Sequence, residues 1–134
     1  MVGFMMKLID WRDEFELGIQ SVDHEHRELI QLINDLYEES VIQGSKTAVL
    51  DFFGELYAGI ASHFALEEKI MQEREYDQYR EHKDDHEKLL DEIRDFMDDY
   101  ENTDEFPEHL FREILEQWFV THFKNMDSRL HKYL

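Results

Sequence analysis

Residues 82–100 read HKDDHEKLLDEIRDFMDDY, and their apolar residues recur every three or four positions. This spacing predicts an amphipathic helix, because side chains three and four residues apart lie on one face of a helix. His82 and His86 fall on the same stripe as the apolar residues, about one turn apart. The stripe consists of His82, His86, Leu89, Ile93, Phe96, Met97 and Tyr100.

The same periodicity returns in three other stretches, at residues 22–36, 49–67 and 111–126. Breaks fall at 43–46 (QGSK), around 73–77 (EREYD) and at 101–107 (ENTDEFP), where Pro107 suits the first turn of a helix. Short connections make neighbouring helices antiparallel. We therefore predict an all-α, up-down-up-down four-helix bundle at residues 21–134. An N-terminal arm, residues 1–20, is expected to pack on it through Trp11, Phe15 and Ile19.

Composition narrows the possible partners. The 134 residues suffice for one domain, and 33 acidic against 14 basic residues give a net charge of −19. Nucleic acid and anionic membrane surfaces are therefore not expected as partners. The absence of cysteine excludes disulfides, iron–sulfur clusters and cysteine nucleophiles. The start, MVGFMMKLID, resembles neither a secretory signal nor a membrane span, so we expect a cytoplasmic protein. We also expect a monomer, with no long apolar stripe exposed.

Seven metal-ligating side chains lie on or beside the four apolar stripes. Alone, each has a simple explanation: a buried histidine is commonly hydrogen-bonded in the core, and a histidine pair among charges commonly faces water. As a set they would need partners, because an unpaired buried polar group costs about 1–3 kcal/mol. The set comprises His26, His63, Glu67, His82, His86, His122 and Asp127.

Their positions along the chain distinguish these interpretations. In an antiparallel hairpin, residues at one height are equidistant from the turn. The pairs 26 and 63, 67 and 82, and 86 and 122 each have their midpoint inside one of the three breaks. All four helices are therefore predicted to bring donors to one level of the core, near the second turn. This convergence predicts a metal site.

The donor set favours two metal ions over one. A structural zinc takes four ligands, whereas five imidazoles and two bridging carboxylates would fill two octahedral ions and, with a bridging hydroxide, leave one position open. No Glu-x-x-His pair of the ferritin type occurs, and HExxH is absent. His122 and Asp127 are five residues apart, so both reach one site only if it lies between their directions or if a π-type turn intervenes.

The motifs together resemble the bacterial hemerythrin family over nearly the whole chain. They are GIQSVDHEHREL, HFALEE, HKDDHEKL and WFVTHFKNMD, preceded by DWRDEFELGI. The resemblance implies a non-haem di-iron centre with an oxo or hydroxo bridge. His82, His86 and His122 would bind one iron, His26 and His63 the other, and Glu67 and Asp127 would bridge them.

The function implied by the resemblance is reversible binding of dioxygen, for oxygen transport, storage or sensing, at the iron with two histidines. The protein would then not be an enzyme, and an oxygen-using enzyme is a candidate partner. Two alternatives remain open: a di-iron enzyme acting on peroxide or nitric oxide, and an iron-sensing module.

Apolar side chains beside the donors are predicted to form the walls of a dry dioxygen pocket. Water or protons reaching the reduced ligand would let it leave as hydrogen peroxide and strand both irons in the ferric state, and apolar walls oppose their entry. The family often has Trp-Leu-Val-Asn-His-Ile where this chain has WFVTHF, so Phe119 and Phe123 are bulkier here and are hypothesised to narrow the pocket. His24, His109 and His131 match no motif and are expected at the surface. The predicted walls are Leu29, Phe64, Trp118, Phe119 and Phe123.

Overall fold

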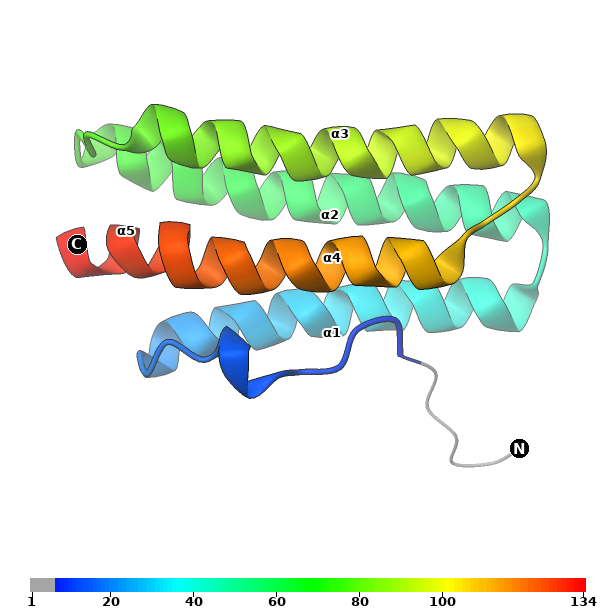
Figure 1. Ribbon diagram of the computed structural model, residues 1–134, viewed down its shortest axis with the longest axis horizontal. Helices are drawn as coiled ribbons and strands as arrows, with labels where there is room; N and C mark the ends of the chain where they lie inside the picture. Colours follow the sequence, from blue (N-terminus) through cyan, green and yellow to red (C-terminus); the bar gives the residue numbers. More distant parts are fainter. Residues whose placement is uncertain (1–6) are drawn as a thin grey trace.

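The computed structural model describes residues 7–134, which form helices and contain no strand. Helices α1, α2, α3 and α4 run alternately in opposite directions along one axis (Figure 1). The predicted all-α, up-down-up-down four-helix bundle is confirmed. None of the helices formed by these residues is long and apolar enough to cross a membrane. The elements are η1 (Asp13–Phe15), α1 (Gln20–Gln43), α2 (Lys46–Glu73), α3 (Tyr79–Thr103), α4 (Glu108–His122), η2 (Phe123–Asp127) and α5 (Ser128–Tyr133).

The helix ends follow from local backbone chemistry. Gly44 ends α1 in the left-handed conformation (φ 65°), which glycine adopts without steric cost, and its N–H bonds the Ser40 carbonyl. Ser45 begins α2 by accepting a hydrogen bond from the Ala48 N–H at 3.1 Å. Pro107 directly precedes α4. Each predicted break overlaps one of the observed connections, although α3 continues to Thr103 and so includes the first three residues of the break at 101–107.

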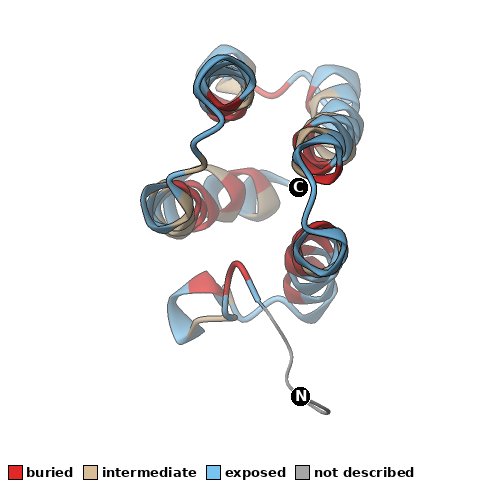
Figure 2. Cartoon of the chain, turned by 90° about the vertical axis from the view of Figure 1, so that its right-hand side faces the viewer, coloured by how far each residue is buried: buried red, intermediate tan, exposed pale blue. Residues whose placement is uncertain are grey.

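The bundle core has two chemically different ends. Near the first and third turns it is aromatic, with ring centroids 5.2 Å apart for Phe53 and Phe106 and 4.8 Å apart for Phe96 and Phe111. The opposite end holds the starts of α1 and α3, the end of α2, and α5 (Figure 1). The buried residues of every helix face inward (Figure 2). Of the eight buried polar residues described, all but Asn34 and Ser40 lie toward the second-turn end.

Residues 7–19 lie along α1 and α4. Asn34 on α1 accepts hydrogen bonds from the N–H groups of Leu8 and Ile9, and Phe15 is fully buried with its ring centroid 5.6 Å from that of Phe123. Trp11 packs against the same core, whereas Ile19, expected to pack there, is 37% exposed.

The division into an arm (1–20) and a bundle (21–134) stays a prediction. The first six residues of that arm lie outside the described residues.

Candidate metal centre

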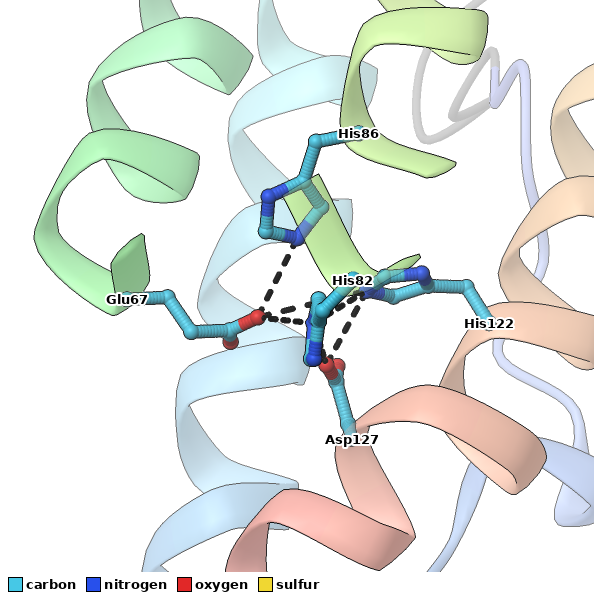
Figure 3. Close-up of side chains that lie close together, drawn as sticks. All are labelled: Glu67, His82, His86, His122 and Asp127. Carbon is cyan, nitrogen blue, oxygen red and sulfur yellow. Dashed lines mark hydrogen bonds and ion pairs between the residues drawn. The ribbon is translucent and has the colours of Figure 1, made fainter. Parts of the chain in front are cut away.

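Five donor side chains from three helices and the η2 turn converge inside the second-turn end of the bundle (Figure 3). Each offers one ligand atom, and these atoms all lie within 4.8 Å of one another. Glu67 Oε1 lies 2.6 Å from His82 Nε2 and 3.1 Å from His86 Nε2. The four donors other than Glu67 are almost fully buried. The five are Glu67, His82, His86, His122 and Asp127.

Asp127 connects this cluster to α1. Its Oδ1 lies 3.0 Å from Nε2 of both His82 and His122, and its Oδ2 lies 3.0 Å from Nε2 of His26. The two oxygens of one buried carboxylate thus face histidines on different sides, the arrangement that a bridging carboxylate needs. Six of the seven predicted donors are brought together in this way.

His63 is the donor that stands apart. It lies on α2 one turn before Glu67, is half-buried, and forms no hydrogen bond or ion pair with the other six within residues 7–134. Burial lowers its pKa, against the opposite influence of Glu67. His63 and Glu67 both line a cavity of about 580 Å³ between α1, α2 and α5. The centre is therefore closest to solvent at these two residues.

A π-helical turn resolves the five-residue spacing between His122 and Asp127. Residues Phe123–Asp127 form η2, a π turn between α4 and α5. In such a turn a residue bonds the fifth residue along, so positions i and i+5 lie roughly one above the other. Of the two arrangements considered from the sequence, the structure has the π turn. It lets both side chains face the same core.

Aromatic rings cover the buried imidazoles. Phe64 stacks on His86 with centroids 3.8 Å apart, and Phe123 stacks on His26 at 3.7 Å. The Trp118 ring lies 4.2 Å from that of His122.

The two remaining predicted wall residues are placed differently. Phe119 is fully buried and contacts the other aromatics, with its ring 5.3 Å from those of Trp118 and Phe123. Leu29 lines the cavity beside His63 instead. The dioxygen pocket built from these five residues stays a prediction.

Two carboxylates that the sequence did not single out contact the outer nitrogens of the histidines. Asp85 Oδ2 lies 2.7 Å from His122 Nδ1, and Glu68 Oε2 lies 2.9 Å from His86 Nδ1. Both residues sit next to a predicted donor in charged runs, so their spacing carries no distinct signal.

Of the other histidines, His24 and His109 are exposed, as expected, and each is paired with a glutamate. His131 lines the cavity.

The electrostatics of the centre favour protons held between imidazoles and carboxylates. Burial opposes charge on His122, but Asp127 and Asp85 raise its pKa to about 9. Burial likewise acts against the ionised form of Asp127, yet His122, His26 and His82 keep the pKa of its carboxyl well below the ordinary range. A metal ion at the same place would displace these protons, because imidazole and carboxylate ligands bind metals in their deprotonated forms.

The donor chemistry fits metal ions. Among residues 7–134, three buried polar atoms of the centre find no hydrogen-bond partner: Nδ1 of His26, Nδ1 of His82 and Oδ1 of Asp127, the last although two ring nitrogens lie 3.0 Å away. Nε2 of His82 and Nε2 of His122 face each other at 3.1 Å. Such crowding of lone pairs in a dry core is costly unless something positive lies among them. Imidazole and carboxylate together suit iron, zinc and related divalent ions.

Comparisons with known proteins agree on one family. The family model described as Hemerythrin HHE cation binding domain matches residues 17–134. A bacteriohemerythrin of Stenotrophomonas maltophilia (strain R551-3) is 30% identical over 125 residues, covering 92% of this chain and 79% of that protein. A bacteriohemerythrin of Pseudomonas aeruginosa (strain UCBPP-PA14) is 29% identical, covering 88% and 76%.

Two further comparisons agree, one of sequence and one of structure. A hemerythrin from Sipunculus nudus is 29% identical over 119 residues, covering 89% of this chain and 87% of that protein. A crystal structure of a hemerythrin variant superimposes with a TM-score of 0.72 at 22% identity, covering 92% of this chain and 94% of the other.

Proposed function

The chain belongs to the hemerythrin family, and we propose that it is a non-haem di-iron protein that binds dioxygen reversibly in the core of its bundle. The observation that carries the proposal is the convergence of donors from separate helices at one buried level (Figure 3). When bound, the two irons would supply the electrons for uptake of dioxygen and recover them on its release.

The proposed ligand assignment follows the positions of the side chains. His82, His86 and His122 would hold one iron, and their Nε2 atoms already face Glu67 or Asp127. His26 and His63 would hold the other, with His26 joined to the cluster through Asp127 Oδ2. Glu67 and Asp127 would bridge the pair. His63 would complete the set from the edge of the cavity.

The residues around the donors would keep water from most of the centre. Three aromatic rings lie flat against buried imidazoles, and His26, His82, His86 and His122 are each at most 1% exposed. The cavity beside His63 and Glu67 is the proposed approach for dioxygen, because those are the two donors that it reaches. A centre whose buried histidines are covered by aromatic rings favours release of the ligand unchanged.

A carrier is proposed in preference to an enzyme. Asp85 and Glu68, the carboxylates nearest the donors, are each hydrogen-bonded to a histidine. Glu25 and Glu28 also line the cavity beside His63, so the preference for a carrier rests on the match to the hemerythrin family.

The remaining proposals concern location and partners. We propose a cytoplasmic protein that supplies oxygen to an oxygen-using enzyme and, given its net charge of −19, does not bind nucleic acid. Leu32, Leu66 and Ile70, from two helices, remain exposed along the cavity. The monomer and the absence of a long exposed apolar stripe stay predictions.

The visible spectrum of the iron-loaded, reduced protein tests this function. Under argon the spectrum should be featureless; admitting air should produce a charge-transfer band, and sparging with argon should remove it through several cycles. A one-way change to a ferric spectrum, together with rapid turnover in the presence of a reductant, would favour the enzyme or the iron sensor instead. A chain variant with His82→Ala serves as the control that should give no band.

A further inference from the structure

A histidine that binds metal through Nε2 must carry its proton on Nδ1. The group facing Nδ1 decides whether that tautomer is populated, because an acceptor there stabilises the Nδ1–H form. The four buried histidines differ in this respect. Nδ1 of His122 and Nδ1 of His86 each face a carboxylate, whereas Nδ1 of His26 and Nδ1 of His82 have no hydrogen-bond partner in the part of the chain that the structure describes.

Asp85 reaches His122 from the neighbouring helix in two ways. Its Oδ2 lies 2.7 Å from His122 Nδ1, joining α3 to α4 at the edge of the imidazole. Its backbone carbonyl accepts a hydrogen bond from Trp118 Nε1 at 3.2 Å, and the Trp118 ring stacks on His122 with centroids 4.2 Å apart. Asp85 thus contacts the edge of the His122 ring directly and, through its hydrogen bond with Trp118, helps to position the indole that stacks on the face of that ring.

Glu68 has the corresponding position at His86. Its Oε2 lies 2.9 Å from His86 Nδ1, while the adjacent Glu67 places Oε1 3.1 Å from Nε2 of the same ring. Lys83 Nζ lies 3.7 Å from Glu68 Oε1 and forms an ion pair with the same carboxylate. Both ring nitrogens of His86 therefore contact carboxylates, those of the consecutive residues Glu67 and Glu68.

We propose that Asp85 and Glu68 are positioning residues that fix the Nδ1–H tautomers of His122 and His86, so that both Nε2 atoms face the metal. The inference rests on the proposed function, whose ligand set it extends. It makes the two metal positions unequal: the three-histidine position has two anchored donors, and the position of His26 and His63 has none among the contacts described. The three-histidine position should therefore bind metal more tightly.

Titration of the chelated protein with Co²⁺ tests this, with visible absorption as the readout. Asp85→Leu removes the acceptor with little change in side-chain size. The affinity of the three-histidine position for Co²⁺ is expected to fall 10- to 100-fold. Asp85→Asn keeps an oxygen acceptor without charge and should fall between wild type and Asp85→Leu. Asp84→Leu and Asp84→Asn are the matched controls, since Asp84 is the exposed neighbouring residue of the same charge. Both should stay within about twofold of wild type.

A second readout separates positioning from general destabilisation. Proton NMR of the Zn²⁺-loaded protein should show two slowly exchanging ring N–H signals, from His86 and His122. Asp85→Leu should remove the signal of His122 alone, and Glu68→Gln should shift that of His86 alone. Circular dichroism checks that each variant folds. If Asp85→Leu does not fold, the test is made with Glu68→Gln.

The outcomes discriminate between two failures. Unchanged Co²⁺ affinity and unchanged N–H signals in both Asp85→Leu and Glu68→Gln, or in whichever of them folds, would overturn the positioning role. Equal losses in the Asp84 and Asp85 variants would also overturn it, because the effect would then be one of net charge. Failure of the wild-type protein to bind two Co²⁺ ions would instead overturn the proposed di-iron centre.

Discussion

Replacing Asp127 with alanine is expected to abolish paired metal binding and to lower the free energy of unfolding of the metal-free protein by about 3–5 kcal/mol. Asp127 is fully buried, and its oxygens lie 3.0 Å from ring nitrogens of His26, His82 and His122. Without it, His122 would keep only Asp85 and, at 4.0 Å, Glu67 as carboxylate partners, and the carboxylate beside His26 would be gone. Urea denaturation of the metal-free variant and its metal content after loading measure the two effects.

The control for this variant is Asp95→Ala, at an exposed position on α3. It removes the same charge and should change stability by less than about 0.5 kcal/mol, with metal content unchanged. If Asp127→Ala still bound two ions per chain, Asp127 would not be a bridge and the ligand assignment would be wrong.

The metal-free protein is expected to lose stability as the pH rises above about 6.5. Burial acts against charge on His122, yet its carboxylate neighbours raise its pKa from 6.5 to about 9 in the folded chain. A raised pKa contributes stability that is fully present below the unfolded value and is lost as the pH rises through the folded value. The expected loss is on the order of 3 kcal/mol.

Glu67 and Asp127 determine how the stability of the metal-free protein falls at acidic pH. Despite burial, their histidine partners lower the pKa of both carboxyls, so their contribution is present above the unfolded pKa of about 4 and is lost as the pH falls further. Thermal denaturation of chelated protein across pH 3–10 should therefore show a maximum near pH 5–6.5. A metal-loaded sample should gain stability from pH 6 to 8, because metal binding requires deprotonated donors. A metal-free curve that is flat or rising above pH 7 would contradict these proton positions.

The helices and their order could be predicted because each uses a local signal. The 3.6-residue stripes, the QGSK and ENTDEFP breaks and Pro107 depend on residues close together in the chain, and the structure places its turns there. Ile19 was misjudged because it lies at the junction of the arm and α1. There the apolar pattern alone does not say which side of the chain faces the core.

The convergence of the donors could also be predicted, since equal distances from a turn place residues at equal heights in a hairpin. This reasoning predicts the level of each donor along the bundle axis. It does not predict the direction in which each side chain points around its helix. His63 is at the predicted level, yet it stands at the edge of the cavity. The π turn was one of two open possibilities, because the sequence FKNMD has no feature that separates a π turn from a regular helix.

Asp85 and Glu68 lay beyond prediction from one sequence. Each belongs to a charged run typical of a solvent-exposed face, and each bonds a histidine on a different helix. Such contacts depend on how side chains rotate across a helix pair. The flat stacking of Phe64 and Phe123 on imidazoles has the same origin, because apolar periodicity predicts burial but not ring orientation.

The most direct test of the account is to count the iron that one chain binds. Chelated protein is titrated with Fe²⁺ under argon, passed through a desalting column and analysed for iron against protein concentration. Two irons per chain are expected for the wild-type protein, and fewer than two for His26→Ala and His122→Ala. A wild-type protein that retained one iron or none would contradict a di-iron centre built from these seven side chains.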